Sequence, residues 1–211
     1  MRYDDYIRHY SYNECVAFKK TKDEYGGLSN MAPGFPLLIN GIKIGTSEAL
    51  YQACRFPHLP KVQHIIIDER SPMTAKMRSR AYLIYSRQDW ALVRVNIMRW
   101  CLRVKLAQNW DKFSELLLST GQKPIVEKCN TKDFWGAKFI DPNTLVGTNA
   151  LGRLLMELRE MLKNPQRITF TVVPPPIISD FLLYEKPIGV VQNTVVSLEP
   201  DNYTASKKWN D

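Results

Sequence analysis

The chain has 211 residues, of which 45% are hydrophobic and 11% aromatic, so it can bury a core and is not a wholly disordered protein. Its formal net charge of +8 favours an anionic partner such as nucleic acid, a nucleotide or a phosphorylated substrate, although a merely soluble basic protein would carry the same charge. The N-terminus lacks the apolar stretch of a signal peptide, and no apolar run approaches membrane-spanning length. We therefore expect a cytoplasmic protein with no membrane partner.

The cysteines and histidines do not indicate a metal site. Cys15, Cys54, Cys101 and Cys129 form no CxxC pair, and the three histidines complete no zinc-binding spacing. Cys54 and Cys101 lie among apolar residues of predicted helices, which indicates buried free thiols and a reducing compartment. We expect neither a metal nor a cofactor.

Secondary-structure signals alternate along the chain. Apolar runs on either side of an Asn-Gly pair predict a β-hairpin over 35–44. Capping residues and helical spacing predict helices over about 46–56, 72–80, 90–107, 111–119 and 149–163. Strand-like runs return between 166 and 198, before a polar tail. The sequence thus predicts an α+β fold, mostly α-helical, with a compact domain in 1–165 and a small β-rich appendage in 166–211.

Three polar residues of the first predicted helix form one stripe. Glu48, Gln52 and Arg55 are spaced i, i+4 and i+7, and Glu48 lies in the first turn, where the helix dipole favours a carboxylate. Such a carboxylate can stabilise an oxocarbenium ion or position a hydroxyl group or a water molecule. The alternative is a solvated helix face.

The next predicted helix carries two basic residues one turn apart, Lys76 and Arg80. Together they can hold a pyrophosphate, or a desolvated Lys76 can attack the C1 aldehyde of an opened ribose. The alternative is an exposed basic face.

Two glycine-containing turns offer hydrogen-bonding groups. In the first, Gly27 precedes Ser29 and Asn30, whose side chains can grip a ribose or a base edge; the alternative is a plain structural turn. In the second, Asn149 can cap the last helix, and Gly152 leaves room for a ligand near free N–H groups that bind phosphate. The alternative is that these glycines only form the turn that precedes the helix.

Aromatic residues beside polar ones indicate a stacking site. Trp135 lies between Asp133 and Gly136, so the indole can stack on a flat base while Asp133 accepts hydrogen bonds from sugar hydroxyls. Trp90, at the start of the long helix, has the same potential. Core packing is the alternative for both tryptophans.

Basic residues follow the long helix and the residues just before it. They are Arg87, Arg94, Arg99, Arg103 and Lys105. This row can follow a nucleic-acid backbone, or its members can pair with acids such as Glu127 and Asp133.

No Ser-His-Asp, Cys-His, metal or P-loop arrangement emerges, which leaves carboxylates, Lys76 and bound phosphates for chemistry. That inventory suits cleavage of an N-glycosidic bond in a phosphorylated riboside.

Five ordered segments, GGLSN, TSEALYQACRF, SPMTAK, DFWG and NALGRLLMELRE, also resemble the NADAR family, which includes the YbiA-like proteins. The resemblance extends from about Phe18 to Leu162 and omits the C-terminal appendage.

The resemblance implies a compact, mostly helical fold with a pocket for ADP-ribose or a related phosphoriboside, and N-glycoside hydrolysis. Some relatives cleave early riboflavin-pathway intermediates, whereas others remove ADP-ribose from guanine as antitoxins to DarT-type DNA ADP-ribosyltransferases. By motif, Asn30 and Glu48 would line the pocket. By the same motifs, the residues that would surround the pocket are Lys76, Trp90, Asp133, Trp135 and Gly152.

One residue departs from the family pattern. Many relatives have lysine where this chain has Arg55, and arginine stays protonated and forms no Schiff base. We expect Lys76 to act instead, in a catalytic set with Glu48 and Asp133. The predicted function is release of ADP-ribose from guanine in DNA, as an antitoxin to a cognate DarT-type toxin. The alternatives are an N-glycosidase of riboflavin-pathway intermediates and a non-catalytic ADP-ribose-binding module.

Overall fold

The computed structural model describes residues 7–131, 134–163 and 170–193. Most of the regular structure is helical: α1 (Ser47–Ala53), α2 (Pro60–Ile67), α3 (Pro72–Arg80), α4 (Trp90–Gln108), α5 (Trp110–Ser119) and α6 (Ala150–Lys163). The longer strands are β1 (Arg8–Ser11), β2 (Val16–Phe18), β3 (Leu37–Ile39), β4 (Ile42–Ile44), β5 (Ile125–Glu127), β6 (Lys138–Asp141) and β7 (Thr144–Gly147). Two-residue strands follow near the C-terminus: β8 (Val172–Val173), β9 (Leu182–Leu183), β10 (Lys186–Pro187) and β11 (Val191–Gln192). The predicted α+β, mostly helical fold is confirmed.

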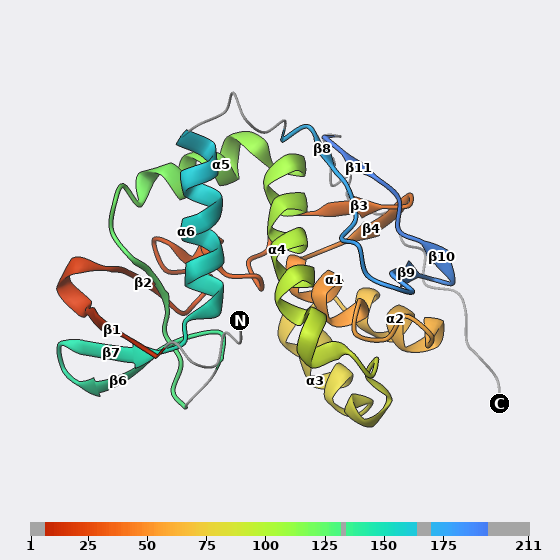
Figure 1. Cartoon of the computed structure of the whole chain (residues 1–211), viewed down its shortest axis with the longest axis horizontal. Helices are drawn as coiled ribbons and strands as arrows, with labels where there is room; N and C mark the ends of the chain where they lie inside the picture. The colour runs from red at the N-terminus through yellow and green to blue at the C-terminus, as the bar shows by residue number, and fades with distance from the viewer. Residues whose placement is uncertain (1–6, 132–133, 164–169, 194–211) are drawn as a thin grey trace.

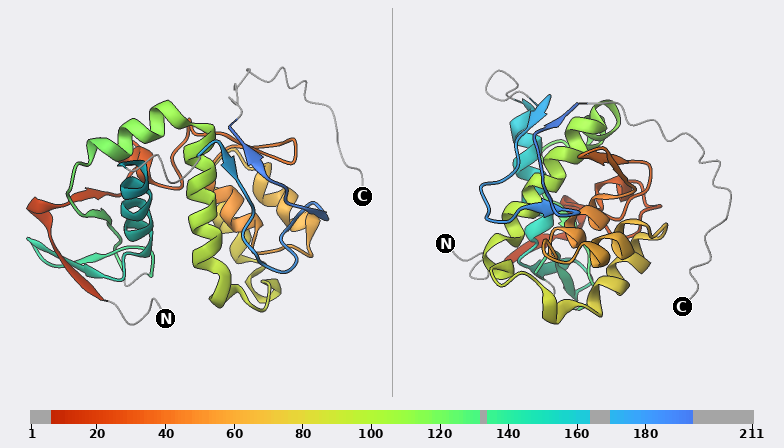
Figure 2. Two further views of the ribbon diagram at one scale, coloured as in Figure 1. Left: turned by 45° about the horizontal axis from the view of Figure 1, so that its top comes forward. Right: turned by 90° about the vertical axis from the view of Figure 1, so that its right-hand side faces the viewer.

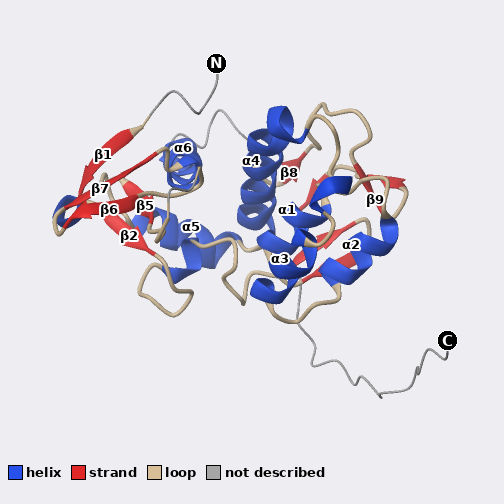
Figure 3. Ribbon diagram, turned by 90° about the horizontal axis from the view of Figure 1, so that it is seen from below, coloured by secondary structure: helices blue, strands red, loops and turns tan. Residues whose placement is uncertain are grey.

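The long helix α4 occupies the centre of the molecule (Figures 1 and 3). α6, α5 and the strands β1, β6 and β7 lie on one side of it, and α1, α2, α3 and the β3–β4 hairpin lie on the other. Ile97, Trp100, Cys101 and Val104 of α4 are buried in the core that joins the two sides. These four residues form one stripe, and the buried Met98, Leu102 and Leu106 form another, so the helix is packed on more than one face.

Strand pairing is local except in two places. β3 and β4 form the predicted antiparallel hairpin, whose turn places Asn40 at φ 50° and Gly41 at φ 80°. β1, β7 and β6 form a three-stranded antiparallel sheet, and β2 pairs with β5 in parallel. These pairings bring the N-terminal strands beside β5 and β7.

Side-chain caps start the two helices that matter most for the site. Thr46 Oγ1 accepts a hydrogen bond from Ala49 N at the start of α1, and Ser71 Oγ accepts one from Thr74 N at the start of α3. Every residue of α1 is buried, so Glu48 and Gln52 do not belong to a solvated helix face, and Arg55, just after the helix, is partly buried.

The C-terminal segment 170–193 packs onto the same core. β8 pairs with β11 and β9 with β10, both antiparallel, and Phe170, Phe181 and Leu183 are buried. Figure 2 shows the segment, in blue, passing beside α4 and across α1 and α2. The predicted boundary at 165 and the polar tail lie outside the described residues, so the two-part division stays a prediction. No helix in the described part of the chain is both long and apolar enough to cross a membrane.

Candidate active site

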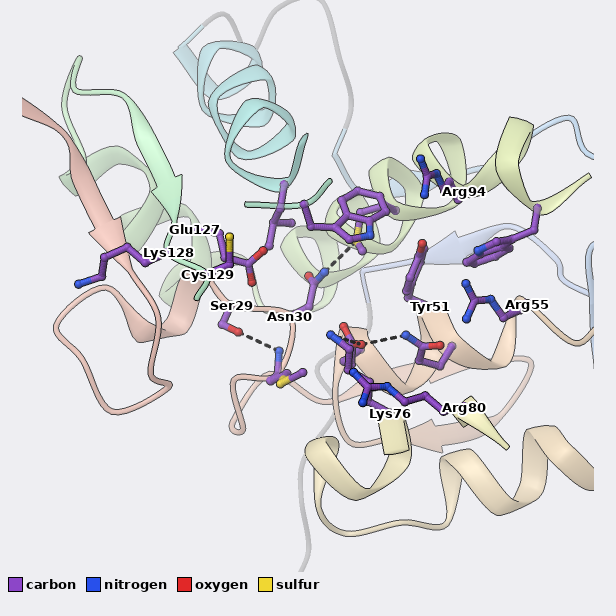
Figure 4. A pocket seen from close by; sticks show the side chains of 17 residues that line it. Ser29, Asn30, Tyr51, Arg55, Lys76, Arg80, Arg94, Glu127, Lys128 and Cys129 are labelled. Atoms are coloured by element: carbon purple, nitrogen blue, oxygen red, sulfur yellow. Dashed lines mark hydrogen bonds and ion pairs between the residues drawn. The ribbon is translucent and has the colours of Figure 1, made fainter. Parts of the chain in front are cut away.

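A cavity of about 280 Å³ opens between α1, α3 and α4 and the segments 29–31 and 127–129 (Figure 4). It gathers side chains from motifs that are far apart in the sequence. The predicted site residues that line it are Ser29, Asn30, Glu48, Gln52, Arg55, Lys76, Arg80, Trp90 and Trp135. The fold therefore places most of the predicted set at one location.

Glu48 is the buried carboxylate of this cavity and is 6% exposed. Gln52 Nε2 donates a hydrogen bond to Glu48 Oε1 at 3.0 Å, and Lys76 Nζ lies 3.9 Å from the same oxygen. Ser79 Oγ in turn donates to Gln52 Oε1 at 3.1 Å, which fixes the amide. A carboxylate oriented in this way can stabilise positive charge that develops on a ligand, because it needs little reorganisation during the reaction.

Aromatic rings form one wall of the cavity. The ring of Tyr51 lies 5.0 Å from that of Trp90 and 5.6 Å from that of Trp135, between centroids. Burial raises the pKa of Tyr51 well above its ordinary value of 10, so its hydroxyl stays protonated and can donate a hydrogen bond. This wall suits a flat base or the face of a sugar.

Two guanidinium groups lie beside this wall. Arg55 Cζ is 4.5 Å from the centroid of Trp90, and Arg94 Cζ is 3.9 Å from that of Phe134. Burial lowers the pKa of Arg55, and the charge of Arg94 lowers it further. Within the described residues, nothing accepts a hydrogen bond from the buried Arg55 Nε. A phosphate oxygen between the two cations would supply an acceptor and relieve their repulsion.

A buried lysine holds the loop that carries Ser29 and Asn30. Lys105 Nζ donates to Gly27 O at 2.6 Å and to Ser29 O at 3.0 Å. Asn30 O accepts from Glu48 N at 3.0 Å, while Asn30 Nδ2 lies 2.8 Å from the sulfur of Met98. Asn30 Oδ1 is buried and has no donor in the described part of the chain, so a ligand hydroxyl can satisfy it.

The predicted glycines have structural contacts instead of lining the cavity. A Cβ on Gly27 would meet the side chain of Leu116 at 2.6 Å, and one on Gly136 would meet Glu127 O at 2.5 Å. A Cβ on Gly152 would collide with Ile125 O. Gly136 and Gly152 need glycine because the backbone of another segment approaches them closely, whereas the neighbours of Gly27 are side chains.

The start of α6 is also engaged by the protein itself. Asn149 is fully buried, with Nδ2 donating to Ile125 O at 2.8 Å and Oδ1 accepting from Glu127 N at 3.1 Å. The N–H groups of residues 149–151 donate to the carbonyls of residues 134–136. These amides are therefore not available to a phosphate, and Asn149 joins β5 to α6. Asp133 lies outside the described residues.

The basic residues of the long helix do not form one exposed surface. Arg87 bonds the carboxylate of Asp89, and Arg99 makes two hydrogen bonds to Glu157, at 2.8 and 3.2 Å. Lys105 is 1% exposed. For these three residues the structure shows pairing or burial, the second of the two alternatives, whereas Arg94 reaches the cavity.

Some lining residues were not among the predicted site residues. They are Met31, Tyr51, Arg94, Met98, Glu127, Lys128, Cys129 and Leu151. Helical spacing contained a signal for Tyr51, three residues after Glu48, and for Arg94, four after Trp90. For Glu127, Lys128 and Cys129 the sequence contained no such signal, because the position of these residues depends on the parallel pairing of β5 with β2. In Figure 4, Lys128 points away from the other labelled side chains.

The sequence model of the NADAR domain family matches residues 17–163 of this chain. Together with the helical fold and the cavity, this match shows that the chain belongs to the NADAR domain family, and the resemblance found in its motifs is confirmed. The N-glycosidase YbiA of Escherichia coli (strain K12) is 35% identical over 156 residues, which cover 74% of this chain and 93% of that protein. The N-glycosidase Npun_R5314 of Nostoc punctiforme is 32% identical over 161 residues, 73% of this chain and 96% of that protein.

The fold is shared as well. The NMR structure of E. coli YbiA superposes with a TM-score of 0.61 at 32% identity, covering 74% of this chain and 90% of that one. The riboflavin biosynthesis protein VVA0006 of Vibrio vulnificus is 32% identical over 148 residues, which are 70% of this chain and 38% of that protein. The names of the N-glycosidase relatives support a hydrolase of glycosidic bonds.

Proposed function

We propose that this protein hydrolyses the N-glycosidic bond between ADP-ribose and guanine in nucleic acid. The observation that carries the proposal is the buried Glu48 carboxylate, paired with Lys76 in a cavity that also presents Arg55 and Arg94. A carboxylate suits the cationic sugar of a glycosidic transition state, and guanidinium groups suit its phosphates. The N-glycosidase relatives support the reaction class.

Binding precedes the chemistry in this proposal. Arg55, Arg94 and Arg80 hold the pyrophosphate, and Trp90 or Trp135 stacks against a base. Asn30 Oδ1 accepts a hydrogen bond from a ribose hydroxyl. Together these contacts place the anomeric carbon near Glu48.

In the reaction, the bond from ribose C1 to the guanine nitrogen breaks, and its electron pair leaves with the base. Glu48 stabilises the positive charge that builds on the sugar. Lys76, as a cation, donates a hydrogen bond to the departing guanine. Water forms the new C1–O bond, and its proton compensates the charge that the base gained.

A polymeric substrate is supported by the net charge of +8 and by Arg80, which is exposed at the cavity. A DarT-type toxin that writes the modification, and an antitoxin role for this chain, belong to the same proposal. So does a cytoplasmic location, which the four free cysteines favour.

A second candidate is hydrolysis of a free phosphoriboside from riboflavin biosynthesis. The names of relatives from Vibrio vulnificus and Zea mays favour it. The cavity of about 280 Å³ also lies near the lower end of small-molecule sites. The same Glu48, Lys76 and arginine contacts would serve this substrate.

Turnover of two substrates distinguishes the candidates. We would measure free ADP-ribose released from a DNA oligonucleotide that carries ADP-ribosylated guanine, and base released from a pyrimidine ribosyl phosphate. Release from the oligonucleotide, weakened by added salt, supports the proposal. Turnover of the small substrate alone supports the second candidate, and tight ADP-ribose binding without turnover of either supports a binding module.

A further inference from the structure

Arg87 connects the C-terminal segment to two residues of the cavity wall. Arg87 is buried, with 8% of the residue exposed. Its guanidinium group donates a hydrogen bond to Ser179 O at 2.7 Å and is held in place by the carboxylate of Asp89. Its backbone N donates to Arg55 O at 3.0 Å, and its backbone O accepts from Trp90 N at 3.1 Å. Arg55 and Trp90 are the pair whose side chains stack at 4.5 Å in the cavity.

Gln63 of α2 makes a second connection. Its Nε2 donates to Ala53 O at 3.2 Å and to Leu182 O at 3.0 Å, and its Oε1 accepts from Tyr184 N at 2.8 Å. Gln63 is fully buried, so its amide depends on these three bonds for its hydrogen-bond partners. Ala53 is the last residue of α1, two positions before Arg55.

Phe181 anchors the same segment to the central helix. Its ring packs edge-on against Trp100 at 5.0 Å, and it is buried. The segment is thereby attached to α4 and, through Arg87 and Gln63, to the end of α1. None of its residues contributes to the lining of the cavity.

We propose that residues 170–193 are a brace for the wall formed by Arg55 and Trp90, with Arg87 as the positioning residue. This segment lies outside the 17–163 region that matches the NADAR domain, so the brace is a feature of this chain beyond that domain. Arg55 faces the like charge of Arg94, and a guanidinium group held in place binds an anion more tightly than a mobile one. The brace thus sets affinity for the phosphate-bearing ligand, and it rests on the proposed function only for the identity of that ligand.

The test uses the full chain with two variants. Arg87→Ala removes the bond to Ser179, and Phe181→Leu loosens the segment without touching Arg55 or Trp90. Arg99→Ala is the matched control, because Arg99 lies on the same helix but pairs with Glu157 of α6. Hydrogen exchange of the amides of residues 54–56 is measured without ligand, and ADP-ribose binding is measured by calorimetry well below the unfolding temperature.

Arg87→Ala is expected to exchange these amides about tenfold faster and to weaken ADP-ribose binding about tenfold, since a charged hydrogen bond contributes roughly this much. Phe181→Leu, which loses ring contacts with Trp100, is expected to change both quantities in the same direction. The control changes neither. Wild-type exchange and affinity in a folded Arg87→Ala would overturn the brace; if that variant does not fold, Phe181→Leu decides in the same way. If wild type does not bind ADP-ribose, the proposed function fails, and hydrogen exchange alone decides on the brace.

Discussion

Lys76 Nζ and Glu48 Oε1 lie 3.9 Å apart, and they reach the cavity from different helices, α3 and α1. This separation is longer than a good hydrogen bond, so a ligand atom can interact with both groups. The side chain of Glu48 is 7% exposed and that of Lys76 is 34% exposed. The carboxylate is therefore the fixed partner, and the ammonium group is the one that can follow a ligand.

Replacing Lys76 separates two roles of the amine. Lys76→Ala should reduce kcat by roughly a hundredfold, the size expected for loss of a proton or charge donor, and Lys76→Arg should restore part of it. Steady-state kinetics on the accepted substrate check this. Full turnover by Lys76→Ala would remove the residue from the mechanism, whereas a completely inactive Lys76→Arg would indicate that a neutral amine is needed.

Arg55 should act in binding. Arg55→Ala is expected to weaken ADP-ribose binding by about tenfold to a hundredfold, because a hydrogen bond to a charged group contributes about 1.5–3 kcal/mol. The affinity of Arg55→Lys for ADP-ribose should lie between those of wild type and Arg55→Ala, since lysine keeps the charge but lacks the planar group over Trp90. Arg78→Ala, whose arginine pairs with Glu69 on the surface, is the control. Unchanged affinity in Arg55→Ala would argue against the phosphate contact.

Lys105 should make stability depend on alkaline pH. Burial, with the nearby Lys112 charge, lowers the pKa of Lys105 well below 10.5 in the folded chain, while the unfolded chain keeps an ordinary value of about 10.4. Between these two pKa values the unfolded chain binds more protons, so folding becomes more favourable as pH rises. The unfolding free energy of wild type minus that of Lys105→Met, from urea titrations, should therefore increase with pH. A constant or falling difference would contradict the lowered pKa.

Gly152 should be required for folding more than for binding. In Gly152→Ala the new Cβ would collide with Ile125 O, which is backbone and cannot move aside easily, so a loss of about 1–3 kcal/mol is expected. Gly45→Ala is the control, because Gly45 has no neighbour within 4 Å among the described residues. Thermal unfolding compares the two. A Gly152→Ala protein of normal stability that fails to bind ADP-ribose would restore the ligand-binding role.

Local signals predicted most helices and the hairpin. Thr46 and Ser71 cap the N-termini of α1 and α3, as their positions in the sequence predicted. The Asn40-Gly41 turn has the positive φ values that such a hairpin requires. Pairings between distant segments were not predictable in this way. β1 joins β7, and β2 joins β5, through hydrogen bonds that no periodicity in a single sequence reveals.

The site was predicted where one helix carries its residues. Glu48 and Gln52 share α1 and Arg55 follows its end by two residues, so helical spacing predicted that the three side chains lie on the same side. The glycines and Asn149 were harder to interpret, because a tight turn beside a ligand and a tight turn beside another segment have the same sequence. Only the approach of Ile125 to Gly152 and Asn149 distinguishes the two cases.

The most direct test of the hydrolytic site is single-turnover release of ADP-ribose by Glu48→Gln, measured beside the binding of ADP-ribose. The amide keeps the shape of Glu48 but cannot carry its charge, so the rate should fall by about a thousandfold while affinity changes only a few fold. Gln52 can still bond to the amide oxygen, which limits structural change. A Glu48→Gln protein that releases ADP-ribose at the wild-type rate would contradict the assignment of Glu48 as the catalytic carboxylate.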